Sequence, residues 1–308
     1  MTAPDPQAAL HGWIILDKPV GLGSTQAVSA VKRALREAGL PKAKVGHGGT
    51  LDPLAEGVLP VAVGEATKLA GRMLDSDKIY EFTVRFGAQT DTLDLEGAVI
   101  ATSDVRPTLA QIETVLPRFT GPIEQAPPAY SAILIDGVRA YDRARAGEAV
   151  EMKLRPVTIH TLSVRASEDG AAGALEAVTL TAHVSKGTYI RSLARDIAQA
   201  LGTVGHVTML RRLKAGPFTL ERAISLDNLR DAAKARAIAQ LMLPLTAGLD
   251  DIPALSVTSE QAMALRQGRT LAGEPRTQGL MLAMEGETPV ALVEAIGPDI
   301  RVVRGFNL

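Results

Sequence analysis

Residues 46–57 read GHGGTLDPLAEG and place the carboxylate of Asp52 in a stretch rich in glycine. Glycines let the backbone adopt positive φ angles and let a substrate approach the main chain closely. Pro53 stiffens the position that follows the acid. A rigid loop that presents one carboxylate suits nucleophilic or general-base chemistry. A lone aspartate can also simply cap a turn, and the pattern alone leaves both interpretations open.

The segments on either side of this loop are predicted to be regular. Trp13–Leu16 and Val58–Val63 are short apolar runs that favour strands. A helix is expected from Gln26 to Gly39, because apolar residues recur there at helical spacing, and Ser24 or Thr25 can cap its start.

The stretch from Tyr80 to Gly87 alternates between apolar and polar residues, which predicts a half-buried strand. Tyr80 is the first residue of its apolar face. It can therefore lie at the rim of a pocket, or it can be one more core aromatic. Val178–Val184 shows the same alternation and predicts a second strand.

A helix is expected from Thr188 to Gly202, after the turn residues Ser-Lys-Gly. Arg191 then lies in the first turn of this helix. From there its guanidinium could reach Asp52 through a bidentate fork, and such a pair would keep the aspartate ionised and aimed. The alternative is an arginine on the surface or on a phosphate.

The composition excludes several classes of chemistry. The chain has 308 residues and no cysteine, so disulfides, thiolate zinc sites, cysteine-ligated clusters and thiol nucleophiles are excluded. Residues 1–10 lack a basic start and a long apolar run, and no apolar stretch reaches membrane-spanning length. We therefore expect a cytoplasmic protein without a membrane partner.

The net charge of -1 argues neither for nor against a nucleic-acid partner. Basic residues nevertheless cluster between His183 and Gly216. This cluster is either a solvated helix face or a footprint for phosphates. Its members are Lys186, Arg191, Arg195, Arg211, Arg212 and Lys214.

The second half of the chain has a different organisation. Residues 121–152 read as a long protruding segment with a short helix near Ala140–Ala146. Residues 226–244 are helical in pattern, and Ala247–Pro253 reads as a linker. The last ~55 residues have short apolar runs broken by glycine and proline, which favours a small β-rich module.

Five motifs occur in order along the chain: GHGGTLDPLAEGVLP, DSDKIYEF, FGAQTDTLDLEG, QAPPAYSA and SKGTYIRSLARD. Together they resemble the bacterial TruB-type tRNA pseudouridine synthases, which isomerise uridine 55 in the T-loop of tRNA. The resemblance extends from about Trp13 to Leu213.

The resemblance implies a mixed α/β (α+β) fold, with a catalytic domain built around a largely antiparallel sheet. The expected catalytic domain is residues 1–248, which includes a protruding RNA-binding insertion at 123–152. A small β-rich PUA-like module is expected at 249–308. The resemblance also implies no metal, no organic cofactor, the T-arm of tRNA as partner, no protein partner and a monomer.

Site residues carried over from the family fall into two groups. Asp52 would be the essential carboxylate, Tyr80 would stack on the target base and take part in proton transfer, and Arg191 would pair with Asp52. The family also implies contacts to the substrate or support of the catalytic loop, from His47, Tyr189, Leu210, Lys18 and Pro19.

Two positions depart from the family pattern. Gly23 stands where the first motif usually has a threonine, and Leu134 stands where a lysine usually follows the QAPPAYSA motif. Both are supporting or RNA-contacting positions. They bear on tRNA affinity more than on the reaction type.

Two rival functions remain at the level of sequence. A glycosidase-like hydrolase would need a second carboxylate about 5–10 Å from Asp52, and Asp94 and Glu56 are the candidates. A non-enzymatic RNA-binding protein would use Asp52 only structurally.

Overall fold

The structure is a computed structural model that describes residues 10–131, 133–148, 152–170, 173–272 and 278–308. The expectation about residues 1–10 therefore falls almost wholly outside the described residues. No helix in the described ranges is long and apolar enough to cross a membrane.

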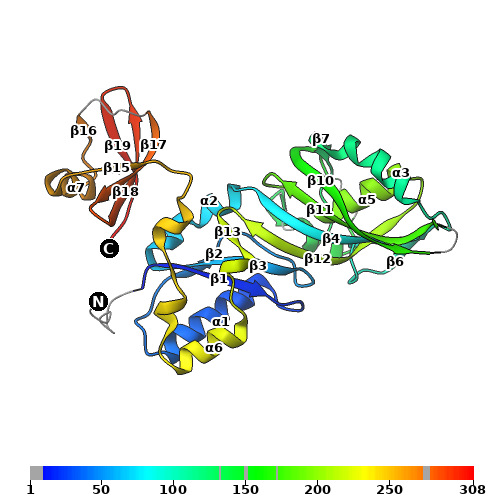
Figure 1. Ribbon diagram of the computed structural model, residues 1–308, viewed down its shortest axis with the longest axis horizontal. Coiled ribbons are helices and arrows are strands. Elements are labelled where there is room, and N and C mark those ends of the chain that lie inside the picture. Colours follow the sequence, from blue (N-terminus) through cyan, green and yellow to red (C-terminus); the bar gives the residue numbers. More distant parts are fainter. Residues whose placement is uncertain (1–9, 132, 149–151, 171–172, 273–277) are drawn as a thin grey trace.

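A ten-stranded sheet forms the centre of the molecule (Figure 1). Its main path runs β14-β1-β3-β12-β4-β11-β10-β7, with β2 paired to β3 and β13 paired to β12. Within the described residues its pairings are antiparallel, apart from the parallel contact of β12 with β3. The strands are β1 Gly12–Lys18, β2 Val45–His47, β3 Glu56–Val63, β4 Lys78–Phe86, β7 Gly121–Gln125, β10 Arg155–Asp169, β11 Leu175–Val184, β12 Gly205–Ala215, β13 Phe218–Thr219 and β14 Leu243–Pro244. The predicted mixed fold around a largely antiparallel sheet is confirmed.

The strands predicted from alternation are confirmed. β4 carries Phe82, Val84 and Phe86 into one hydrophobic cluster, and β11 contributes Val178 and Leu180 to it. Helix α5 (Ile190–Ala200) covers this face of the sheet. The period-2 pattern therefore located the core strands, because one face of each packs on a helix.

Helix α1 (Ser24–Glu37) and helix α6 (Leu226–Lys234) cover the β1–β3 end of the sheet. The predicted cap of α1 is wrong, because Gly23 is the N-cap and its N–H donates to Gln26 Oε1 at 2.8 Å. Ser24 instead turns inward. Its Oγ accepts from the Leu51 N–H at 2.8 Å and donates to the Leu51 carbonyl at 2.9 Å. The start of α1 is thus tied to the loop that carries Asp52.

The helix predicted over residues 226–244 is too long. α6 ends at Lys234, where Arg236 adopts a φ of 56° that breaks the helix. A 3-10 helix at Ile238–Leu241 and the short strand β14 follow. The apolar periodicity continues past the break because Ile238 packs into the same cluster as Leu229.

The C-terminal residues form a second sheet, with strand order β15-β17-β18-β19-β16, and this confirms the expected β-rich module. Helix α7 (Ser259–Arg266) packs on it. The strands are β15 Ala254–Ser256, β16 Leu271–Ala272, β17 Gly279–Glu285, β18 Thr288–Ile296 and β19 Asp299–Gly305. The module is joined to the rest by more than a linker, because Leu282, Leu292 and Phe306 share a hydrophobic cluster with Trp13.

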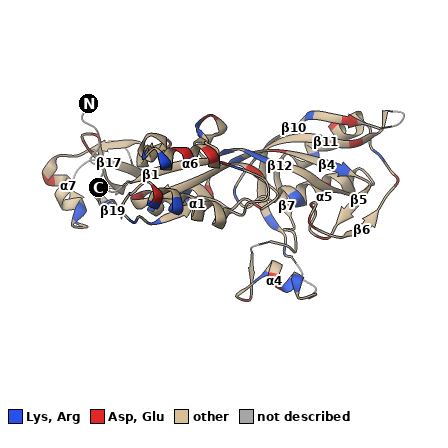
Figure 2. Cartoon of the chain, turned by 90° about the horizontal axis from the view of Figure 1, so that it is seen from below, with Lys and Arg blue, Asp and Glu red and all other residues tan. Residues whose placement is uncertain are grey.

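The protruding segment begins later than predicted. Residues 121–125 form β7, an edge strand that pairs with β10, and Ile123 packs against the core. Beyond it, the hairpin of β8 (Leu134–Ile135) and β9 (Val138–Arg139) and helix α4 (Ala140–Arg145) stand away from the body (Figure 2). We call residues 126–148 the insertion; Ala132 and residues 149–151 lie outside the described residues.

Shorter elements complete the chain. They are η1 Gly64–Leu69, α2 Ala70–Asp75, β5 Ala88–Thr90, β6 Val99–Thr102, α3 Leu109–Val115, η2 Leu116–Phe119, η4 Leu220–Arg222 and η6 Leu245–Gly248.

Candidate active site

A cleft of about 820 Å³ opens where the Asp52 loop, the ends of β4 and β12, the start of α5 and the insertion meet. Asp52, Tyr80, Tyr189, Arg191 and Leu210 all line it. The structure thus brings together five of the eight residues expected from the sequence.

A buried arginine supports the loop that carries Asp52. The sequence did not predict this supporting role. Arg212 is 1% exposed. Its Nε donates to the carbonyl of Val58 at 2.7 Å, and its Nη1 and Nη2 donate to the carbonyls of Thr50 and Gly49 at 3.1 and 3.4 Å. One guanidinium therefore fixes both ends of the loop, because its five donors form a planar fork.

A second buried cation supports the other side of the loop. Lys18 is fully buried, and its Nζ donates to the carbonyls of Leu22, Pro19 and Pro53 at 2.6, 2.9 and 3.3 Å. Burial lowers the pKa of Lys18 from its usual 10.5 to about 8. The expectation that Lys18 contacts substrate is wrong, since a fully buried side chain cannot, but its support of the loop is confirmed.

Gly57 shows why the loop needs glycine. It has a φ of 102°, and a Cβ there would lie 2.3 Å from the carbonyl oxygen of Arg212. Strands β3 and β12 pair in parallel at this point, between Gly57 and Arg212. Any side chain would push β12, and with it the guanidinium, away from the catalytic loop.

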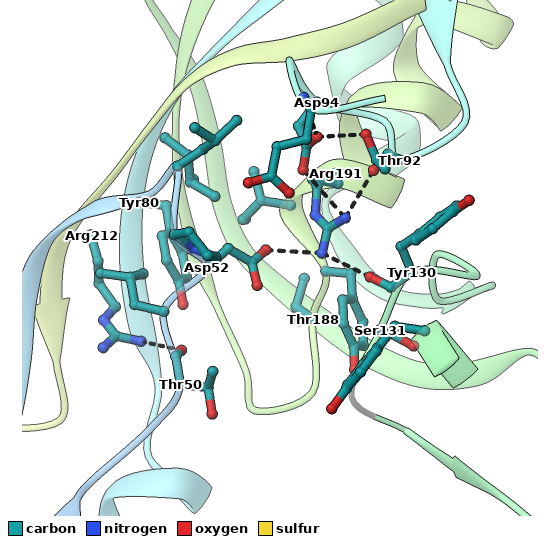
Figure 3. Close-up of a pocket in the computed structure, with 18 of the residues that line it drawn as sticks. Thr50, Asp52, Tyr80, Thr92, Asp94, Tyr130, Ser131, Thr188, Arg191 and Arg212 are labelled. Atoms are coloured by element: carbon teal, nitrogen blue, oxygen red, sulfur yellow. Dashed lines mark hydrogen bonds and ion pairs between the residues drawn. The ribbon is translucent and has the colours of Figure 1, made fainter. Parts of the chain in front are cut away.

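The predicted contact of Arg191 with Asp52 is confirmed, and the interpretation as a surface arginine is wrong. Arg191 Nη2 lies 2.9 Å from Asp52 Oδ2, and the arginine is 8% exposed (Figure 3). The fork is not bidentate on Asp52, because Nη1 lies 3.4 Å from Asp94 Oδ2. Nη1 and Nη2 also donate to the carbonyls of Thr92 and Tyr130 at 2.8 and 3.1 Å.

Asp94 belongs to the site in a way that sequence reasoning missed. It is 8% exposed, and its Oδ1 accepts from Thr92 Oγ1 at 2.5 Å and from the Glu96 N–H at 3.0 Å. Asp94 was considered only as the second carboxylate of a hydrolase. Instead it contacts Nη1 of Arg191, whereas Asp52 contacts Nη2. The sequence shows Asp94 as an acid in the motif DTLDLEG, but a single sequence does not indicate which basic side chain it pairs with.

Glu56, the other candidate for a second carboxylate, also forms an ion pair with an arginine. Its Oε1 lies 3.0 Å from Arg211 Nη1, whose Nη2 lies 2.8 Å from Asp17 Oδ2.

Tyr80 combines the two interpretations offered by the sequence. Its ring packs against the hydrophobic cluster of β4 and α5, and the same ring lines the cleft beside Asp52 (Figure 3). Tyr189 is the N-cap residue of α5 and its N–H donates to Gln125 Oε1 at 2.8 Å. Burial raises the pKa of Tyr189, which keeps its hydroxyl protonated at neutral pH.

His47 and Pro19 lie outside the cleft lining. His47 belongs to β2, and its buried Nδ1 has no hydrogen-bond partner. Burial, with Arg212 as a second cause, lowers the pKa of His47, so the imidazole is neutral at pH 7. Pro19 is exposed, and its carbonyl accepts from Lys18.

The basic cluster between residues 183 and 216 fits neither earlier interpretation. All four of its arginines contact other groups of the protein. Arg191 and Arg212 make the contacts described above. Arg195 forms an ion pair with Asp196 at 2.8 Å, and Arg211 forms ion pairs with two carboxylates. Lys186 is exposed and pairs with Asp75 at 2.9 Å. The four arginines are therefore engaged by groups within the protein rather than forming a free cationic surface.

Two family models match this chain. The model of the TruB family pseudouridylate synthase (N terminal domain) matches residues 33–190, and that of the tRNA pseudouridylate synthase B C-terminal domain matches residues 191–250. The chain belongs to the TruB family of pseudouridylate synthases.

Curated relatives cover almost the whole chain. The tRNA pseudouridine synthase B of Novosphingobium aromaticivorans is 65% identical over 97% of this chain and 98% of its own length. That of Zymomonas mobilis is 63% identical over 99% of this chain and 98% of its own. Among solved structures, a Cbf5-Nop10-Gar1 complex contains a chain with a TM-score of 0.73 and 27% identity, over 96% of this chain and 85% of that one.

Proposed function

We propose that this protein isomerises uridine to pseudouridine at position 55 in the T-loop of tRNA, with Asp52 as the essential carboxylate. The observation that carries the proposal is the 2.9 Å contact of Arg191 with Asp52, in a cleft that Tyr80 also lines. The relatives at 65% and 63% identity bear the name tRNA pseudouridine synthase B.

The chemistry needs no group beyond the side chains present. The C1′–N1 bond breaks, the uracil rotates, a C1′–C5 bond forms, and the proton of C5 is exchanged for one on N1. Asp52 acts as nucleophile or base, and the ion pair with Arg191 aims its carboxylate. The resemblance and this balance agree in requiring neither metal nor organic cofactor.

Tyr80 has a stacking role in this proposal. A uridine inside a folded loop must be flipped out, at a cost of a few kcal/mol. Stacking of a base on an aromatic ring contributes about 1–3 kcal/mol, which offsets much of that cost. Tyr189 and Leu210 close the remaining walls around the base.

We assign the parts of the chain as follows: residues 1–248 catalyse the reaction, the insertion (residues 126–148) within them contacts RNA, and residues 249–308 form a PUA-like RNA-binding module. The partner is the T-arm of tRNA, and the protein acts as a monomer in the cytoplasm.

The test is an assay with unmodified tRNA that carries tritium at uridine C5. Isomerisation releases tritium and leaves the tRNA chain intact. Release of free uracil would identify a hydrolase instead. Binding of tRNA without either product would identify a non-enzymatic RNA-binding protein.

A further inference from the structure

Three side chains with metal-binding atoms converge on the sheet away from the catalytic cleft. His160 Nε2 lies 3.1 Å and His183 Nε2 lies 3.7 Å from the same oxygen, Asp77 Oδ2. The imidazole centroids are 4.7 Å apart and tilted by 45°. Within the described residues, one oxygen or nitrogen from each of these three side chains lies within 4.8 Å of the other two.

The strand register places the cluster on the outer face of the sheet. His183 lies on β11 next to Val184, which lines the cleft, and side chains alternate between faces along a strand. His183 therefore points away from the cleft. Asp77 immediately precedes β4, which pairs with β11 along its length.

A β-bulge brings the third side chain to this face. The register of β10 against β11 shifts between Ile159 and Thr161, which leaves His160 as the extra residue. Ile159 is buried in the core, whereas His160 and Thr161 are both exposed on the outer side. Bulges re-aim a side chain in this way and recur next to functional sites.

The geometry fits a metal ion better than a simple ion pair. An ion pair needs one imidazole, but here two Nε2 atoms face one carboxylate oxygen. Three ligands at the usual zinc distances of about 2.0–2.2 Å in tetrahedral geometry lie about 3.3 Å from one another, close to the two observed separations. Two imidazole nitrogens and one carboxylate oxygen are also a ligand set that zinc binds in proteins.

We propose that Asp77, His160 and His183 form a binding site for a divalent transition-metal ion, with zinc as the reference ion. Nitrogen and carboxylate ligands favour zinc and its neighbours over magnesium and calcium. The side chains of the three ligands are 36–47% exposed, so a water completes the coordination. The ion would link β4, β10 and β11 and so stabilise the folded protein. The site is independent of the proposed reaction.

The test uses the untagged full-length protein and zinc alone, measured by competition with a chromophoric chelator. We expect one zinc per chain and a rise of the melting temperature with zinc. His160→Gln and His183→Gln should each weaken zinc binding by at least about tenfold and remove the thermal shift. His11→Gln is the matched control and should change neither, since His11 accepts a hydrogen bond from the Glu65 N–H outside the cluster.

Circular dichroism must show that the variants are folded like the wild type. The proposal is overturned if folded wild-type protein binds no zinc stoichiometrically. It is equally overturned if zinc binds but both glutamine variants retain the wild-type affinity.

Discussion

Two basic regions of this molecule behave in opposite ways. In the cleft, Arg212 is 1% exposed and all its hydrogen bonds described above go to backbone carbonyls of the protein. In the insertion, helix α4 carries Arg143 and Arg145 on a segment that stands away from the body (Figure 2). Among the described residues, Arg143 pairs with two exposed acids, Asp136 at 3.5 Å and Glu148 at 3.9 Å.

Clustering of basic residues along a sequence therefore does not by itself identify a surface that binds RNA. The cluster at 183–216 has more arginines than the insertion, yet Arg191 and Arg212 of this cluster hold Asp52 and its loop. The ion pairs of the insertion are solvent-exposed and weak. RNA phosphates can therefore replace the carboxylates in these pairs at little cost in free energy. Its charges are therefore the ones we expect tRNA to contact.

Replacing Arg212 should give the largest effect on stability. Arg212→Met leaves the carbonyls of Val58 and Thr50 without their donor in a buried place. Hydrogen bonds to a charged group are worth about 1.5–3 kcal/mol each, so we expect a loss of ~3 kcal/mol or more in the free energy of unfolding. Denaturant titration measures this. A loss below ~1 kcal/mol would show that the arginine does not hold the loop.

Arg191→Lys should be severe for chemistry although it conserves charge. The guanidinium reaches Asp52 with one nitrogen and Asp94 with the other, and a lysine ammonium cannot span both. We expect the single-turnover rate to fall by about tenfold or more, equivalent to at least ~1.4 kcal/mol. Binding of tRNA should change much less. A wild-type rate in this variant would contradict the orienting role.

The double variant Arg143→Ala, Arg145→Ala should show the converse. We expect tRNA binding to weaken by roughly fivefold and to depend less steeply on salt, because each lost phosphate contact removes about one released counterion. The rate at saturating tRNA and the free energy of unfolding should stay near wild type. Unchanged affinity at several salt concentrations would remove the insertion from the RNA interface.

A further prediction concerns the pH dependence of the free energy of unfolding. Burial lowers the pKa of Lys18 to about 8 in the folded protein, against 10.5 when it is solvated. Between these values the unfolded chain binds more protons, so this lysine makes the free energy of unfolding rise with pH from about 8 to about 10.5. Lys18→Met should lose that part of the rise, whereas the exposed control Lys186→Met should keep it. Parallel profiles for wild type and Lys18→Met would contradict the assignment.

The sequence predicted the parts of this site that rest on local patterns. Alternation located β4 and β11, and the turn before α5 placed Arg191 in a first helical turn that reaches Asp52. The resemblance supplied Tyr80. The sequence could not predict that Arg212 is buried under the loop, because that depends on the parallel contact of β12 with β3, two strands about 150 residues apart in the chain.

The same limit explains the other misses. Ser24 has a good capping residue type, but the proximity of Leu51 drew its hydroxyl inward. Asp94 is one of several acids between residues 75 and 96. Only the folded structure shows that it is the one that pairs with Arg191. Lys18 was expected to support the loop, but its complete burial follows from the packing of β1 and was not predicted from the sequence.

In the proposed function, Asp52 performs the chemistry while other parts of the protein bind the RNA. The most direct test compares Asp52→Asn with wild type on tRNA tritiated at uridine C5, with binding measured on the same preparations. We predict that tritium release is abolished and that the dissociation constant for tRNA stays nearly unchanged, since affinity comes mainly from phosphates, shape and stacking. Substantial tritium release by this variant, with the asparagine confirmed by mass spectrometry, would contradict the account.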